Sequence, residues 1–321
     1  MISLSSRSCL PVLILSLALA AGLGCGRRRP VVLPPPTTAV LERASRLEAH
    51  VRFLAEDCQP RNWERTGNLD KAADYIAQSL RATGTEVQEA PYTVQGHTYR
   101  NLIATYGPQG GPVLVIGAYY DACGETPGAD DNASGVAALL EIAREFGKRP
   151  PAERVDLVAF TLEEPPFFRT QDMGSARHAQ GLLEQKTPLR GMIALEMLGR
   201  FSNAPGSQDY PSCLLRPFYP DRGDFVAVVG RFSDLGLARR VKKAMQLASG
   251  LPVVSINAPR FIPGLDFSDH HPYWDRGFKA VMITDTAFYR NHDYHEAEDT
   301  PERLDYRRLA EVVEGVLAAS R

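Results

Sequence analysis

The sequence predicts a three-layer αβα sandwich built around a central mixed β-sheet. Short apolar runs bounded by charged residues or glycine alternate with segments whose apolar residues recur at helical spacing. Such a pattern is typical of buried strands that are separated by helices. Two strand-like segments stand side by side early in the chain, with Gly96 and His97 between them, which favours a hairpin. Alternating strands and helices with an early hairpin favour a mixed sheet over a fully parallel one.

The predicted elements follow one another from residue 41 onwards. Apolar residues at i, i+3, i+4 and i+7 predict helices over 41–54 and 69–80, and Gly84 ends the second. The predicted strands are 86–94, 99–106, 113–118, 155–161, 192–198, 225–229 and 280–284. Further helical patterns cover 136–146, 235–247 and 306–319, and 272–276 is expected to form a short turn.

The N-terminal segment is predicted to serve export rather than folding. The run 10–23 is apolar except for Ser16; it is shorter than the roughly 20 residues of a membrane span and fits a secretory signal. Cys25 follows it as in the lipobox of bacterial lipoproteins, although Gly22 stands where leucine is usual. An N-terminal membrane anchor that is never cleaved is the alternative.

These features divide the chain into three parts and give it a predicted location. Residues 1–25 are a signal peptide with a possible lipobox, 26–37 an Arg/Pro-rich spacer, and 38–321 a single large α/β domain. We expect an exported protein, either periplasmic, tethered to a membrane through a lipidated Cys25, or secreted. The net charge of −2 gives no indication of a nucleic-acid partner.

Cysteine use argues against a zinc site built from thiolates. Beyond the signal segment the chain has Cys58, Cys123 and Cys213, with no CxxC spacing, so at most one disulfide forms among them. No base is placed near Cys123 in the sequence to activate it, which favours an inert thiol.

Carboxylates gather where predicted strands end. Asp121 follows the run 113–118, and Asp130 and Asp131 lie in a Gly/Ser-rich turn before a helix. Glu164 comes after the run 155–161. Ligand sites in such sheets collect at the carboxyl ends of strands, and clustered carboxylates suit divalent cations. Glu196 is the exception because it lies within its run. His295 follows the run 280–284. Together these residues predict a metal-dependent hydrolase.

The adjacent pair Glu163 and Glu164 suits a division of labour. A divalent metal lowers the pKa of a bound water to about 7, and a glutamate that is not a ligand can move the proton. Pro165-Pro166 ends the strand directly after the pair, so the two side chains need not point to opposite faces. A solvated acidic loop is the alternative for this pair alone.

An ordered set of motifs carries a family resemblance. Gly-Ala-x-Tyr-Asp, Gly-Ala-Asp-Asp-Asn-Ala-Ser-Gly, Glu-Glu, Leu-Glu-Met-Leu-Gly, Ser-Asp-His and Tyr-His-x-x-x-Asp-Thr occur in that order. From about Asn68 to the C-terminus, the chain resembles family 28 of the metallopeptidases, the co-catalytic zinc aminopeptidases, whose fold is shared with glutaminyl cyclases. The resemblance implies a zinc-exopeptidase-like fold, a single zinc-peptidase-like catalytic domain over 38–321, and one or two zinc ions.

The resemblance also implies roles for matching residues. Asp131 would bridge two zinc ions, and Glu164 and His295 would complete the shell of one of them. Glu163 would be the general base, and Asp121 would orient a ligand. Glu196 falls where many members carry a ligating aspartate; a structural salt bridge is the alternative for this residue. Asp269 in the Ser-Asp-His motif would line the rim of the site, and His270 beside it is expected to be a hydrogen-bonded loop residue.

Tyr119 departs from the family pattern, which usually has a zinc-ligating histidine at this position. A phenol in water has a pKa of about 10 and must lose its proton to bind a metal well. Three interpretations stay open: Tyr119 binds as a phenolate, the first metal is lost and one zinc remains, or the chain is catalytically silent. A single Asp-Glu-His zinc beside a glutamate resembles the glutaminyl cyclases.

We therefore expect an exported zinc-dependent exopeptidase that removes N-terminal residues from peptides. The alternatives are a single-zinc transferase that resembles the glutaminyl cyclases, and a catalytically silent binding domain with a peptidase-like pocket. Holding the free α-amine of a peptide needs a carboxylate, and Glu196 or Asp269 would serve if not bound to metal.

Overall fold

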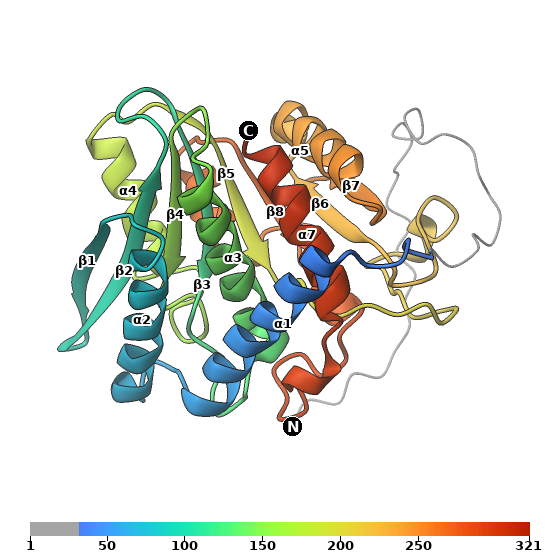
Figure 1. Cartoon of the computed structure of the whole chain (residues 1–321), viewed down its shortest axis with the longest axis horizontal. Coiled ribbons are helices and arrows are strands. Elements are labelled where there is room, and N and C mark those ends of the chain that lie inside the picture. Colours follow the sequence, from blue (N-terminus) through green and yellow to red (C-terminus); the bar gives the residue numbers. More distant parts are fainter. Residues whose placement is uncertain (1–31) are drawn as a thin grey trace.

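The computed structural model describes residues 32–321 and contains, within them, one eight-stranded sheet (Figure 1). The strand order is β1-β2-β4-β3-β5-β8-β6-β7. The strands are β1 (Val87–Val94), β2 (His97–Tyr106), β3 (Val113–Tyr119), β4 (Val155–Phe160), β5 (Leu189–Glu196), β6 (Val226–Gly230), β7 (Val253–Asn257) and β8 (Ala280–Thr284). β1, β2 and β4 pair antiparallel, whereas β4, β3, β5 and β8 run parallel to one another. The predicted mixed sheet with an edge hairpin is confirmed.

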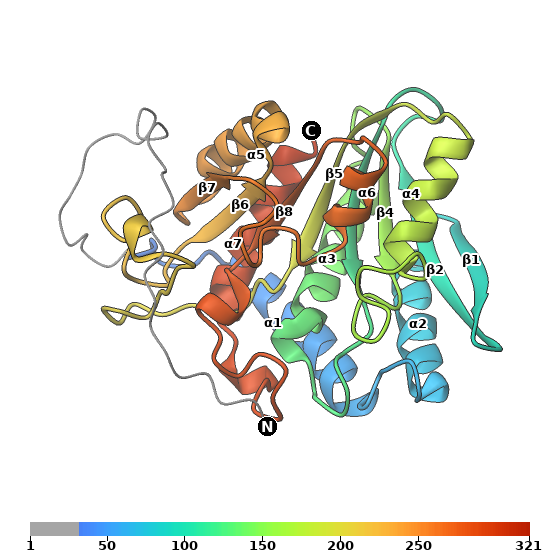
Figure 2. The ribbon, with the colours of Figure 1, turned by 180° about the vertical axis from the view of Figure 1, so that it is seen from behind.

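Helices cover both faces of the sheet and complete the three layers. On one face lie α1 (Thr38–Arg52), α2 (Thr66–Arg81), α3 (Gly135–Lys148), α5 (Leu235–Ala248) and α7 (Tyr306–Ala319) (Figure 1). On the other face lie α4 (Gly174–Glu184) and α6 (His270–Asp275) (Figure 2). Side chains along β3 point alternately to the two faces of the sheet. Leu114 and Ile116 pack in the apolar core on the face covered by α3, and Val113 and Val115 pack in the core on the face covered by α4 and α6.

Two strands differ from the prediction. The sequence does not predict β7, because this edge strand has mostly half-buried side chains and therefore no continuous apolar run. β5 begins three residues earlier than expected and ends at Glu196. The sequence suggested that Glu196 lies within its strand. The structure instead places Glu196 at the carboxyl end of β5. Met197 has a φ of 42°, which turns the chain out of the sheet directly after Glu196.

The four parallel strands end at the same edge of the sheet. In the register of the sheet, Tyr119 pairs with Phe160 across β3 and β4, and Glu196 pairs with Thr284 across β5 and β8. The loops that follow these strands therefore start next to one another. This is the edge at which open α/β sheets bind their ligands.

The export segment lies outside the described residues. Residues 1–31 hold the predicted signal peptide, Cys25 and the first half of the predicted spacer, so the division at residues 25 and 37 stays a prediction. Among the helices of residues 32–321, none has both the length and the apolar composition to cross a membrane.

Candidate metal centre

Asp131 lies in an irregular turn that leads into α3. The backbone leaves helical geometry at Asp131 and Asn132. The Asp299 carboxylate accepts hydrogen bonds from the backbone N–H groups of Asp130 at 3.1 Å and of Asp131 at 3.0 Å. The side-chain amide of Asn132 bonds to the backbone around the end of β5 at 2.9 and 3.0 Å. The turn is thus held against both the C-terminal loop and β5.

Asp121 positions the two adjacent glutamates. Its carboxylate accepts hydrogen bonds from the backbone N–H groups of Glu163 at 3.1 Å and Glu164 at 3.0 Å. β4 ends at Phe160 and Leu162 has a φ of 59°, so both glutamates lie outside the strand, as predicted. Burial raises the pKa of Asp121 to about 6, and the two backbone donors oppose that rise. Asp121 therefore acts on the backbone of the glutamates.

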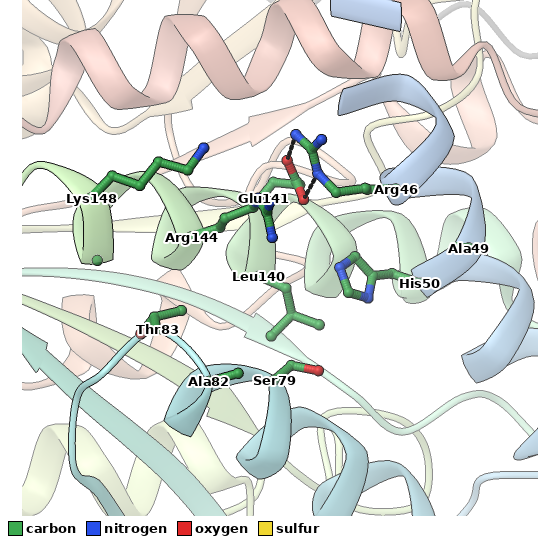
Figure 3. Close-up of a pocket in the computed structure, with 11 residues that line it drawn as sticks. Arg46, Ala49, His50, Ser79, Ala82, Thr83, Leu140, Glu141, Arg144 and Lys148 are labelled. Carbon is green, nitrogen blue, oxygen red and sulfur yellow. Dashed lines mark hydrogen bonds and ion pairs between the residues drawn. The ribbon is translucent and has the colours of Figure 1, made fainter. Parts of the chain in front are cut away.

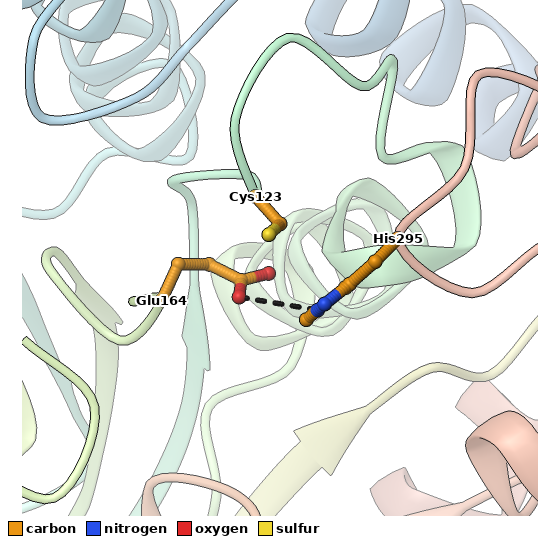
Figure 4. A group of neighbouring side chains, drawn as sticks. All are labelled: Cys123, Glu164 and His295. Carbon is orange, nitrogen blue, oxygen red and sulfur yellow. Dashed lines mark ion pairs between the residues drawn. The ribbon is translucent and has the colours of Figure 1, made fainter. Parts of the chain in front are cut away.

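His295 joins two of the predicted metal ligands. Its Nε2 atom lies 3.2 Å from Asp131 Oδ2. The same atom lies 3.3 Å from Glu164 Oε2, a contact that Figure 4 shows. Burial alone lowers the pKa of His295, but the nearby polar groups of Asp131, Cys123 and Glu164 outweigh burial and raise it. The carboxylates therefore favour a positive charge at this point, which either a proton on the imidazole or a metal ion supplies.

Buried polar atoms without a hydrogen-bond partner mark the same place. They include Asp131 Oδ2, Glu164 Oε1, Glu196 Oε2 and His295 Nε2. Burial, and then the charge of Asp131, raises the pKa of Glu164 to about 8. Burying several carboxylates costs free energy unless a cation or hydrogen-bond donors compensate them. Carboxylate oxygens and an imidazole nitrogen are donors that zinc takes in proteins, so these residues fit a zinc ion.

Glu163 is buried beside Glu164, and its carboxylate is not one of those that contact His295 Nε2. Its pKa is raised well above the usual range, first by burial and then by the charges of Glu164 and Glu196. A carboxyl group with a raised pKa is suited to taking and returning a proton near neutral pH.

Tyr119 lies between two carboxylates. Its hydroxyl is hydrogen-bonded to Glu196 Oε1 at 2.8 Å and also contacts Asp131 Oδ1. The pKa of Tyr119 is raised well above its ordinary value, first by burial and then by Asp131 and Glu196, which favours the neutral phenol. Glu196 forms no ion pair with any basic residue of the 32–321 region, so a structural salt bridge does not explain its burial.

The Ser-Asp-His motif contributes a carboxylate rather than an imidazole. Asp269 is buried just before α6, and neither of its carboxylate oxygens has a hydrogen-bond partner. Burial raises its pKa to about 8. His270 Nε2 lies 2.8 Å from the carbonyl oxygen of Leu265, and burial lowers its pKa to about 3. His270 is thus hydrogen-bonded, as the sequence predicts, but it is the first residue of α6 and not the loop residue that the sequence suggested.

Cys123 is nearer to the site than the sequence indicated. One ligand atom each from Cys123, Glu164 and His295 lie within 4.8 Å of one another (Figure 4). The only hint in the sequence is that Cys123 follows Asp121 by two residues. Cys58 is buried and Cys213 exposed, and within residues 32–321 all three cysteines are free.

A second group of acids, which consists of Asp130, Asp285 and Asp299, packs against the turn. The sequence indicated Asp130 but not that it forms a group with the other two. Asp130 accepts hydrogen bonds from the backbone N–H of Gly199 at 2.8 Å and from the Asn291 amide at 3.1 Å. Asp130 and Asp285 are hydrogen-bonded to each other. Asp299 belongs to the Tyr-His-x-x-x-Asp-Thr motif, which is the one signal that could have identified it.

A pocket of about 490 Å³ opens away from this centre, between α1, α2 and α3 (Figure 3). None of the predicted site residues lines it. Arg46 and Glu141 face each other there through two hydrogen bonds of 2.8 Å that join α1 to α3. Because Arg46 and Glu141 neutralise each other, we interpret this ion pair as a packing contact between α1 and α3 and not as part of a second functional site.

Comparison with known proteins agrees with the geometry. An Escherichia coli (strain K12) protein, "Uncharacterized protein YfbL", is 47% identical over 297 residues, covering 90% of this chain and 91% of its own. A "Probable zinc metalloprotease" of Pyricularia oryzae is 26% identical over 79% of this chain; it is longer, and the match spans 58% of it.

Solved structures of low identity share the fold. "BSAP, a zinc aminopeptidase from Bacillus subtilis" superposes with a TM-score of 0.67 at 15% identity, covering 86% of this chain and 94% of its own. The glutaminyl cyclase of Porphyromonas gingivalis superposes with a TM-score of 0.65 at 22% identity, covering 86% and 97%.

The family assignment rests on a match over most of the chain. The sequence profile of Peptidase family M28 matches residues 101–320, which include every residue of the metal centre described above. The donors at the centre and the family agree on zinc as the metal. The chain belongs to Peptidase family M28.

Proposed function

We propose that the protein is a zinc-dependent aminopeptidase that binds one zinc ion through Asp131, Glu164 and His295. The observation that carries this proposal is the meeting of His295 Nε2 with Asp131 Oδ2 and Glu164 Oε2 at 3.2 and 3.3 Å. When bound, zinc would polarise the scissile carbonyl and lower the pKa of a water molecule. Similarity to proteins named zinc metalloprotease and zinc aminopeptidase supports the same chemistry.

Glu163 would move the proton in this reaction. It lies beside Glu164 on a loop whose backbone Asp121 holds through two hydrogen bonds. The carboxylate would take the proton of the attacking water and later pass it to the leaving amine. Because Asp121 bonds to the backbone of both glutamates, it would set the position of the base and of the ligand together.

We propose that Asp269 or Glu196 holds the α-amine of a peptide. Both oxygens of Asp269 and Oε2 of Glu196 are buried without a hydrogen-bond partner. An ammonium group has three donors and would satisfy such oxygens. We propose that one of these groups receives the free N-terminus, which would restrict the enzyme to the ends of peptides.

A single zinc is the arrangement that Tyr119 supports. Its hydroxyl lies between Asp131 and Glu196, the two carboxylates that would flank a second metal. The pKa of the phenol is raised, so forming a phenolate ligand there would be unfavourable. We propose that the hydroxyl takes the place of the second ion and that neither Tyr119 nor Glu196 is a ligand in the resting enzyme.

The single-zinc arrangement also favours a second candidate, cyclisation of N-terminal glutamine. One metal beside a glutamate acid/base resembles the glutaminyl cyclases, and a glutaminyl cyclase shares the fold over 86% of this chain. The peptidase-type turn around Asp131 favours hydrolysis over cyclisation. Export, through the predicted signal in residues 1–25, remains part of the proposal and is separate from the chemistry.

One experiment tests these points together. Zinc per chain is measured on the purified protein, and hydrolysis of leucine anilide and cyclisation of a glutaminyl peptide are assayed on the same sample. One zinc with anilide hydrolysis supports the proposal, and one zinc with cyclisation alone supports the second candidate. Absence of zinc and of both activities would leave a silent binding domain.

A further inference from the structure

The thiol of Cys123 faces the proposed zinc ligands. Cys123 Sγ and a donor atom each of Glu164 and His295 lie within 4.8 Å of one another (Figure 4). Three donors at such spacing can surround one ion with small adjustments, since Zn–S bonds are about 2.3 Å and Zn–N and Zn–O bonds about 2.0–2.2 Å.

The loop that carries Cys123 is held in place by a buried arginine. Arg61 is fully buried and donates hydrogen bonds to the carbonyl oxygens of Tyr120 at 3.0 Å, Pro127 and Gly128. These carbonyls lie on both sides of Cys123 in the chain. The loop is therefore anchored before and after the cysteine, and five guanidinium donors suit such a ring of acceptors.

The residues next to Cys123 are held as well. The backbone N–H of Ala122 donates to the carbonyl oxygen of Arg61 at 2.9 Å, and the Asn62 amide donates to the carbonyl oxygen of Gly124. Cys123 thus stands between two residues whose backbones are each bonded to the segment 61–62. A thiol on a loop fixed at both of its neighbours has a defined position relative to His295.

A second observation points to a cation at this place. Glu164 and Asp131 are 4% and 2% exposed, and each has a carboxylate oxygen without a hydrogen-bond partner. Both contact His295 Nε2, which lies within reach of Cys123. The thiol is therefore next to a buried group of acids that a positive charge would stabilise.

We propose that Cys123 is a ligand of the zinc ion, as the fourth donor beside Asp131, Glu164 and His295. The inference rests on the proposed zinc site and adds a sulfur ligand to it. On binding, the thiol would lose its proton to solvent and its sulfur would bond to the metal as a thiolate, with no change of oxidation state. Two oxygens, one nitrogen and one sulfur would then give the ion four protein donors.

A complete shell of protein ligands has a consequence for this site. Catalytic zinc sites keep a position open for water or substrate, whereas sites with four protein ligands are closed. Binding of Cys123 would hold the metal tightly in the resting state. Hydrolysis would then require Cys123 to make room for water or substrate at the ion.

Cobalt substitution tests the proposal, because zinc itself has no useful absorption. The whole protein is loaded with Co²⁺ and compared with Cys123→Ser, Cys213→Ser and His295→Ala. Visible bands report cobalt in the site, and an intense near-ultraviolet band reports a thiolate bound to cobalt. We expect both bands in the unchanged protein and in Cys213→Ser, whose altered thiol is exposed. Cys123→Ser should keep the visible bands and lose the near-ultraviolet band.

The outcomes separate the sulfur ligand from the zinc site itself. Visible bands without the near-ultraviolet band in the unchanged protein would overturn the sulfur ligand and leave the zinc site intact. A near-ultraviolet band that survives in Cys123→Ser would also overturn it. Visible bands that persist in His295→Ala would overturn the zinc site on which the inference rests. As a second readout, the Kd for zinc should rise at least about tenfold in Cys123→Ser and stay unchanged in Cys213→Ser.

Discussion

The hydroxyl of Tyr119 is hydrogen-bonded to Glu196 at 2.8 Å, where β3 and β5 both reach the edge of the sheet. The same hydroxyl contacts Asp131, so one neutral group links the two acids that a second metal would otherwise share. The O–H carries one hydrogen and therefore donates to one of the two carboxylates at a time. In the one-zinc arrangement proposed above, the phenol would supply this donor to acids that no second metal compensates.

Replacing Tyr119 with histidine should restore a second metal position. Tyr119→His would put a neutral nitrogen donor where the phenol lies, and Glu196 could then turn from the hydroxyl to a metal. We expect the zinc content to rise from one towards two per chain, measured by elemental analysis after dialysis. Tyr119→Phe is the matched control, because it removes the hydroxyl without supplying a donor, and its zinc content should not rise. Equal metal content in Tyr119→His and the unchanged protein would contradict the proposal.

The two adjacent glutamates should respond differently to the same change. Glu163→Gln should lower kcat about 10²- to 10⁴-fold, because the amide cannot accept the proton, while zinc stays bound. Glu164→Gln should lose zinc, since it weakens a direct ligand. Metal content and anilide hydrolysis are measured on both variants. Loss of zinc from Glu163→Gln with retention in Glu164→Gln would reverse the roles assigned to them.

Strong local patterns made part of the fold predictable. α7 covers residues 306–319, as predicted, because its apolar stripe repeats without interruption. The half-buried edge strand β7 has no such pattern. β5 ends at Glu196 because the turn at Met197 is held by Asn132, 65 positions away in the sequence. That long-range hydrogen bond leaves no trace in the local sequence.

The site residues also fall into a predictable part and a part that the local sequence does not indicate. Motif order indicated Asp131, Glu164 and His295, and the structure brings them together. The place of Cys123 depends on Arg61, which follows α1 and belongs to no motif that the sequence showed. The sequence therefore identified the acids at the strand ends but not the loop between two of them. Which loop residues approach a site depends on such tertiary anchors rather than on spacing.

The pair of Asp130 and Asp285 should make stability depend on pH. Burial raises the pKa of Asp285 to about 6, and burial together with Asp285 raises that of Asp130 well above its usual range. The folded protein therefore binds more protons than the unfolded chain, whose aspartates titrate near pH ~4. Its free energy of unfolding should fall as pH rises from there through the folded pKa values. Asp130→Asn supplies a permanently neutral group and should flatten this slope by up to about 1.4 kcal/mol per pH unit.

Urea unfolding between about pH 5 and pH 8 measures that slope, because this range lies above the pKa of unfolded aspartate. Asp57→Asn is the control, since Asp57 is exposed and its removal should leave the slope unchanged. A slope in Asp130→Asn equal to that of the unchanged protein would mean that the pair does not share a proton.

Arg61 should be needed both for stability and for the place of Cys123. Arg61→Lys keeps the charge but cannot reach the carbonyls of Tyr120, Leu54 and the 127–128 segment at once. Leaving buried carbonyls without donors should lower the free energy of unfolding by about 2–3 kcal/mol, measured by urea unfolding. Arg65→Lys is the matched control, because Arg65 is exposed and its ion pair with Glu125 spans 3.6 Å. It should change stability by less than about 0.5 kcal/mol.

Because the loop that carries Cys123 would loosen, the cobalt-loaded Arg61→Lys protein should also show a weaker thiolate band than Arg65→Lys. Equal bands in the two variants would show that Arg61 stabilises the fold without positioning the thiol.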